Sequence, residues 1–232
     1  MTARPRVSPA SKLVCVAGLA AEARIAGRAG FATVVGAGDR RRTEALVAAA
    51  TSGAGCLVSF GIAGALSPEL RPGDLILSAE IASAADAWHG EPAWCGRLAA
   101  LGRSIGAAFA PVFGAADIVA TRVEKARARA RFGAAAVDLE SDIVARAAAA
   151  SGIPFAVLRA IADPAERDLP PAALIPLAAD GRPDLAAVCA SVLRRPQQMA
   201  ALVGLFGETR RALRALARAA PVLHSLAAGG CR

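Results

Sequence analysis

The order of apolar runs and helix-like segments along the chain predicts an α/β protein. Short apolar runs, typical of buried strands, occupy residues 13–17, 31–35, 56–60, 74–81, 112–119, 137–140 and 155–161. Alanine-rich segments with helical spacing alternate with them, at residues 40–50, 97–109, 123–132 and 141–152. This alternation predicts one domain in three layers, with helices on both faces of a twisted, mostly parallel mixed sheet.

The ends of the chain differ in composition from its middle. Residues 1–11 are rich in proline, serine and arginine and are expected to form a flexible lead-in. The domain is expected to span residues 12–220, with a short tail over 221–232. Its last helices are predicted at 184–194 and 197–219, after a proline-rich loop.

Two other segments have patterns that do not predict a single element. Residues 82–96 show no clear period and are expected to form an irregular loop carrying Trp88, His89 and Trp94. Those tryptophans are expected in the core, or in a pocket for an apolar group. Residues 45–68 carry no charge, but glycines interrupt them, so a helix followed by a buried strand is predicted instead of a membrane span.

The amino-acid composition argues against two classes of function, namely nucleic-acid binding and metal binding. The net charge is +8, carried by 25 Arg and 2 Lys against 19 acidic residues. Seven Phe, two Trp and no Tyr leave few aromatic platforms for stacking bases, so nucleic-acid binding is not expected. The five cysteines have no CxxC spacing and the two histidines are far apart. We therefore expect no metal site, and a reducing, cytoplasmic setting.

Carboxylates follow three of the predicted strands. Glu22, Glu140 and Asp163 each come at or just after the end of an apolar run. Ligands bind beyond the carboxyl ends of strands in open parallel sheets, and grouped carboxylates suit glycosidic bond cleavage. Each acid also has a structural interpretation, because first-turn acids and caps stabilise helices. The residues alone leave these two interpretations open.

Four short motifs add a resemblance to a known family. They are FGIAGAL at 60–66, PGDLI at 72–76, VDLES at 137–141 and RAIAD at 159–163. In this order and spacing, they resemble the purine nucleoside phosphorylase / methylthioadenosine nucleosidase superfamily. The segments DGRPDL at 180–185 and LRRP at 193–196, with a compressed N-terminal region, most resemble the hopanoid-associated branch, which is thought to remove adenine from adenosylhopane.

The resemblance implies a role for each acid. Asp163 matches the acid that protonates or hydrogen-bonds the purine N7, and Glu140 matches the glutamate that binds the ribose. Glu22 matches the carboxylate that activates water in nucleosidases. The resemblance of these motifs also implies that Gly61, Ile62, Leu139 and Arg159 lie in the substrate site.

Some positions depart from the family pattern. Leu139 stands where nucleosidases carry methionine, and Ala162 stands where a serine often precedes the catalytic aspartate. Residues 121–125, in the region that supplies an aromatic over the purine, contain none. Ile62 lacks the hydroxyl that family members often carry in this loop. This absence, together with Glu22, favours water over phosphate as nucleophile. No cofactor is expected, with inorganic phosphate as the alternative co-substrate.

The main alternative functional motif is an anion site that would follow the second predicted strand. Residues 36–38, with the sequence GAG, precede Arg40, Arg41 and Arg42 at a predicted helix start. Backbone N–H groups and guanidinium groups there could hold phosphate. Consecutive helical residues point about 100° apart, so a solvated helix face is the favoured interpretation.

The last helix suggests where the protein works. Its apolar positions fall largely on one side, and four arginines crowd its second half. A helix covering the sheet is the favoured interpretation, and a basic amphipathic helix touching an anionic membrane is the alternative. We expect a small or lipid-linked nucleoside substrate and self-association. A non-catalytic protein that binds nucleosides or lipids is the rival of another class.

Overall fold

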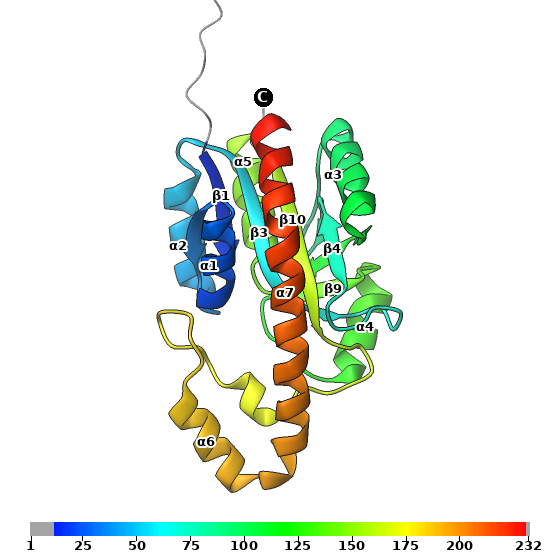
Figure 1. The fold of residues 1–232 in the computed structure, drawn as a ribbon. Coiled ribbons are helices and arrows are strands. Elements are labelled where there is room, and N and C mark those ends of the chain that lie inside the picture. The colour runs from blue at the N-terminus through cyan, green and yellow to red at the C-terminus, as the bar shows by residue number, and fades with distance from the viewer. Residues whose placement is uncertain (1–11, 231–232) are drawn as a thin grey trace, which may run out of the picture.

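The computed structural model describes residues 12–230 as a single α/β unit built on one curled, mixed sheet (Figure 1). The expected lead-in over residues 1–11 lies outside the described residues. The strands are β1 (Lys12–Ala17), β2 (Ala32–Val35), β3 (Ala54–Ala65), β4 (Leu75–Ser78), β5 (Glu80–Ala82), β6 (Ala87–His89), β7 (Ala107–Phe109), β8 (Val112–Gly114), β9 (Ala136–Asp138) and β10 (Phe155–Asp163). The predicted fold class is confirmed.

Helices cover the sheet and extend beyond it. They are α1 (Ala20–Arg28), α2 (Arg40–Thr51), α3 (Pro92–Ile105), α4 (Arg122–Phe132), α5 (Ser141–Ser151), α6 (Leu185–Arg194) and α7 (Met199–Gly230), with 3-10 turns η1 (Pro171–Leu174) and η2 (Pro196–Gln198). The charge-free run over residues 45–68 therefore forms the end of α2 and then β3, as predicted. Within residues 12–230, no helix is both long and apolar enough to cross a membrane.

The long strand β3 organises the sheet. Along most of its length it pairs in parallel with β1 on one side and β10 on the other. Its last residues pair antiparallel with β9, where Gly64 lies opposite Val137. The strand thus joins the sheet's main part to the smaller β9-β8-β5-β6 part, and the sheet curls. As a result, the carboxyl ends of β1, β3, β9 and β10 lie close to one another.

Helix α7 has two halves with different surroundings. Its second half packs on β3 and β10, where Ala212, Leu216 and Leu223 are fully buried. Its first half runs with α6 beyond the carboxyl ends of these strands (Figure 1). The covering-helix prediction therefore holds for the second half. The helix continues through Pro221 to Gly230, past the expected end at 219.

Several predicted boundaries were wrong. Residues 82–96 are ordered as β6 and the start of α3, because Pro92 suits the first helical turn and Trp94 anchors that turn in the core. The Trp94 indole donates a hydrogen bond to the Phe155 carbonyl at 2.7 Å. The 74–81 run divides into β4 and β5, and the 112–119 strand ends at Gly114. Helix α3 ends at Gly106 in the left-handed conformation, which frees 107–109 to form β7.

Candidate active site

The three carboxylates that the sequence singles out are all buried at the carboxyl end of the sheet. Glu22 lies in the first turn of α1, just after β1. Glu140 directly precedes α5, and Asp163 is the last residue of β10. Their exposed fractions are 1%, 7% and 9%, respectively. Charged residues are rarely this buried without partners, so these positions need specific contacts.

Glycines at strand ends let the acids approach the sheet. A Cβ atom added to Gly18 would lie 2.8 Å from Glu140 Oε1, and one added to Gly64 would lie 3.2 Å from Asp163 Oδ2. At Gly61 it would lie 2.6 Å from both Glu22 Oε1 and Arg159 Nη1. All three acids therefore touch the backbone at the ends of β1 and β3, and the structure brings them together from distant parts of the chain.

Glu22 combines a capping role with a contact across the sheet. Its Oε2 accepts hydrogen bonds from the backbone N–H of Gly18 at 3.0 Å and of Leu19 at 2.8 Å, which caps α1. Its Oε1 accepts from the N–H of Ile62 at 2.7 Å, which helix capping does not require. Burial raises the pKa of Glu22 to about 7, with Arg159 opposing the rise and Glu140 adding to it. The carboxyl group is thus suited to exchange a proton near neutral pH.

A single buried guanidinium holds this end of the sheet together. Arg159 on β10 is 1% exposed, and its Nη2 donates to Ser59 Oγ at 2.6 Å and Glu140 Oε2 at 3.0 Å. Its Nε lies 2.7 Å from Asp138 Oδ2. Burial and the Asp138 charge raise the pKa of Glu140, while Arg159 opposes that rise. With Glu22 close by, three carboxyl groups surround one cation.

Asp138 is a site residue to which sequence reasoning gave no role. Its Oδ1 accepts from the N–H of Glu140 at 3.0 Å and of Ser141 at 2.8 Å, which fixes the turn into α5. Its Oδ2 binds Arg159 and the hydroxyl of Ser141, and that hydroxyl lies 3.0 Å from Ser59 Oγ. The sequence holds a signal for this role, since Ser59 and Asp138 are polar residues within otherwise apolar runs.

Lys125 is the second residue that was missed. Its wholly buried ammonium pairs with Asp163 Oδ2 and also donates to the carbonyls of Pro164 at 2.9 Å and Arg167 at 3.0 Å. Burial raises the pKa of Asp163, and Lys125 opposes this rise. Lys125 lies in the 121–125 segment that was expected near the base, and it is one of only two lysines in the chain.

The remaining predicted binding residues surround the acids. Gly61 is buried, while Ile62 and Leu139 are partly exposed. Ile62 packs on the main core. Leu139 packs on a second cluster that includes Phe113 and Phe132, whose rings stack with centroids 4.1 Å apart. Ile62 and Leu139 thus give the site an apolar, partly accessible surface.

Two of the three arginines at the start of α2 have protein partners. Arg40 pairs with Asp142 on α5 and lies 3.4 Å from Glu44. Arg42 donates to the carbonyl of Ala179, and Arg41 is exposed. Arg40 is therefore paired with carboxylates and Arg42 with a backbone carbonyl, which agrees with the favoured interpretation of a helix face.

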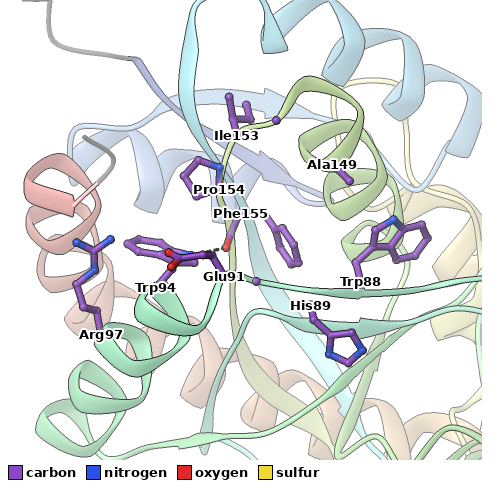
Figure 2. Close-up of a pocket in the computed structure, with 11 residues that line it drawn as sticks. Trp88, His89, Glu91, Trp94, Arg97, Ala149, Ile153, Pro154 and Phe155 are labelled. Atoms are coloured by element: carbon purple, nitrogen blue, oxygen red, sulfur yellow. Dashed lines mark hydrogen bonds between the residues drawn. The ribbon is translucent and has the colours of Figure 1, made fainter.

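A cavity of about 410 Å³ lies at the opposite end of the sheet, lined by Trp88, His89, Glu91, Trp94 and Phe155, among others (Figure 2). Phe155 begins β10 and Asp163 ends it, so the full length of this strand separates the cavity from the acids. Trp94 is 2% exposed and belongs to the core, whereas Trp88 is partly exposed.

Residues 23–195 match the family described as the phosphorylase superfamily. The chain belongs to that superfamily. A search of curated proteins found no match. Among solved structures, the 5'-methylthioadenosine/S-adenosylhomocysteine nucleosidase from Neisseria meningitidis, in complex with methylthio-immucillin-A, is similar at a TM-score of 0.68. It is 15% identical, with 93% of this chain and 100% of that chain covered.

Two Helicobacter pylori proteins show the same fold as this phosphorylase superfamily member. One is a mutant of the 5'-methylthioadenosine/S-adenosylhomocysteine nucleosidase with 5'-methylthioadenosine in its active site, at a TM-score of 0.63 and 13% identity, covering 90% of this chain and 97% of that one. The other is a mutant futalosine hydrolase, at a TM-score of 0.62 and 12% identity, covering 90% and 98%. The likeness extends over nearly the whole of each chain.

Replacing Gly61 tests the close packing of the acids. In Gly61→Ala, the new methyl group would overlap Glu22 and Arg159, so we expect a loss of about 1–3 kcal/mol in the free energy of unfolding. Gly96→Ala is the matched control, because Gly96 is exposed in α3 with no heavy atom within 4 Å of an added Cβ. Chemical denaturation measures both, and a Gly61→Ala variant as stable as the control would contradict the packing described.

Proposed function

We propose that this protein is a nucleosidase that hydrolyses the N-glycosidic bond of an adenine nucleoside. Membership of the phosphorylase superfamily supports cleavage at this bond, and the solved relatives named above include nucleosidases. Three carboxyl groups meeting at the carboxyl ends of the strands supply the acid, the base and the sugar-binding group that this reaction uses.

The grouping of three carboxyl groups around the single guanidinium of Arg159 is the observation that favours water over phosphate. Glu22, Asp138 and Glu140 surround that single guanidinium, and Arg40 is neutralised by Asp142 and Glu44. A phosphate dianion entering this cluster would meet like charges in a poorly solvated place, where repulsion is strong. Water carries no such cost.

The proposed reaction assigns one step to each acid. Asp163 gives its proton to the purine N7 while the electron pair of the C1′–N9 bond moves into the base. Glu140 accepts hydrogen bonds from the ribose hydroxyls as positive charge develops on the sugar. Glu22 takes a proton from the water whose oxygen bonds to C1′. The products are adenine and a free sugar.

Adenosylhopane is the proposed substrate, and the α6–α7 surface supports a lipid-linked nucleoside. That surface exposes Leu185, Leu193, Met199, Val203 and Phe206, with exposed fractions of 50–83%. Helix α6 contains no acid, and the one acid in the first half of α7, Glu208, pairs with Arg167. Arginines at 194, 195, 210 and 211 flank the apolar side chains.

Apolar side chains bordered by arginines are typical of surfaces that lie on anionic membranes. The α6–α7 surface also lies beyond the strand ends that carry the acids (Figure 1). Gly181, in the segment before α6, accepts a hydrogen bond from Ala20 N–H at 3.1 Å, next to Glu22 in α1. We therefore propose peripheral contact with an anionic membrane, which would bring a lipid-linked nucleoside to the site from a cytoplasmic protein.

Release of adenine with and without inorganic phosphate tests the proposed reaction. We expect wild-type protein to release adenine from adenine nucleosides at the same rate in both conditions. Asp163→Asn should lower that rate by about two to four orders of magnitude, the usual effect of losing a general acid. A requirement for phosphate, with a sugar phosphate as product, would establish phosphorolysis. Binding without release by the wild type would establish a non-catalytic binding protein.

The pH profile tests the role of Glu22. Because the base must be ionised and its pKa is about 7, kcat/KM should fall about tenfold per pH unit below that value. Glu22→Gln cannot ionise, so its residual activity should lack this acidic limb. The profile is measured with stopped assays from pH 4 to 9. If Glu22→Gln keeps the acidic limb unchanged, the group that must lose a proton for activity is not Glu22.

Vesicle co-sedimentation tests the membrane contact. Wild-type protein should bind phosphatidylglycerol vesicles at low salt and phosphatidylcholine vesicles poorly. The double variant Leu193→Ser/Phe206→Ser should bind at least about tenfold more weakly, since it removes two exposed apolar side chains. Val123→Ser is the control, because Val123 is 51% exposed on α4, outside this surface. Absence of binding, or a dimer that buries Leu193 and Phe206, would contradict the membrane contact.

A further inference from the structure

Lys125 is a buried cation whose donors are all used. The side chain leaves α4 and is fully buried. Its ammonium group has three protons, and the structure gives it three acceptors, which are Asp163 Oδ2 and the carbonyls of Pro164 and Arg167. Burying a lysine costs several kcal/mol before its partners compensate, so general packing does not explain this arrangement.

The contacts fix the end of β10 as well as the carboxylate. Lys125 binds both the last side chain of the strand and the two carbonyls that follow it. Around it, Leu169 N–H donates to the Ala120 carbonyl at 2.8 Å, and Arg122 N–H donates to Asp168 Oδ1 at 2.7 Å. The start of α4 is therefore attached to the segment after β10 at several points, and Asp163 is held through one oxygen, leaving Oδ1 for a ligand.

The charges around Asp163 make Lys125 its principal counter-ion. Arg167, in the segment after β10, and Glu208, on α7, also face this carboxyl group, but they form an ion pair with each other. Their effects on the Asp163 pKa are opposite in sign, whereas Lys125 touches the carboxylate directly. A negative charge that appears on Asp163 is therefore stabilised mainly by Lys125.

We propose that Lys125 is a positioning residue for proton transfer to the base: it orients Asp163 through Oδ2 and stabilises the carboxylate that remains after the proton has left. This inference rests on the proposed nucleosidase function. As the C1′–N9 electron pair moves into the purine, the proton on Asp163 goes to N7 and the carboxylate becomes anionic. Lys125 keeps its three protons throughout, so the step is balanced without another reactant.

The pH profile of Lys125 variants tests this role. Lys125→Met and Lys125→Gln remove the positive charge, and Gln keeps hydrogen-bond donors. In both, the alkaline limb of kcat/KM, where Asp163 loses its proton, should move up by about 1 to 3 pH units. The kcat should fall about tenfold to a hundredfold, because the acid is weaker. Lys125→Arg keeps the charge and should keep the limb near its wild-type position. An unmoved limb in Lys125→Met and Lys125→Gln would overturn the proposal.

A double variant separates this role from a general effect on folding. If Lys125 acts through Asp163, adding Lys125→Gln to Asp163→Asn should lower the rate no further than Asp163→Asn alone. If the two substitutions instead lower the rate by factors that multiply, Lys125 acts independently of Asp163 and its role is only structural. Thermal melts of each variant monitor folding, and Lys125→Arg serves as the charged comparison if the neutral variants are unstable.

Carbon-13 NMR of the Asp163 carboxyl group gives a readout that needs no activity. Asp163→Asn identifies the signal by its disappearance. The titration midpoint should be about 1 to 3 pH units higher in Lys125→Gln than in the wild type. If the midpoint moves but the wild type releases no adenine, the proposed function fails and the ion-pair coupling stands. If the midpoint does not move, the role assigned to Lys125 fails whatever the reaction is.

Discussion

The buried guanidinium of Arg159 is the interaction on which the rest of this site depends. It extends from the central strand β10 to Asp138, Glu140 and Ser59, and so connects β10 with β9 and β3. Removing it would leave two carboxylates buried without their counter-ion, a situation that costs about 3–5 kcal/mol in other proteins. Glu22 also lies near this cation, so three carboxyl groups share it. The cluster that holds the strands together is therefore also the basis of the proposed preference for water.

The fold supplies this cluster by bringing strand ends together. Strand β3 pairs with β1 and β10 first and with β9 at its end, so the acids that follow those neighbouring strands meet. Because Gly18, Gly61 and Gly64 have no side chain, the carboxylates can lie against the backbone at these positions. The acids can then be buried and still close to one another, and burial raises the pKa of Glu22 into the neutral range. Position in the sheet thus determines the chemistry of each acid.

Much of this arrangement could be predicted from the sequence, because strand ends and apolar runs are local signals. The alternation of strands and helices, and the placement of Glu22, Glu140 and Asp163 after strands, follow from residues next to one another in the chain. Lys125 could not be assigned in that way, since α4 reads as an exposed, arginine-rich helix and its burial depends on a segment forty residues later. The helical turn at Trp94 was predicted as an irregular loop for a similar reason, because the side chain that anchors it bonds to the Phe155 carbonyl in a distant strand.

We propose that the carboxylate cluster around Arg159 admits water, and not phosphate, as the nucleophile. The most direct measurement is the reaction in oxygen-18 water with phosphate present, followed by mass spectrometry of the released sugar. We expect a free sugar, which carries oxygen-18 at C1′, and no sugar phosphate. A sugar phosphate, with no label from water, would contradict it.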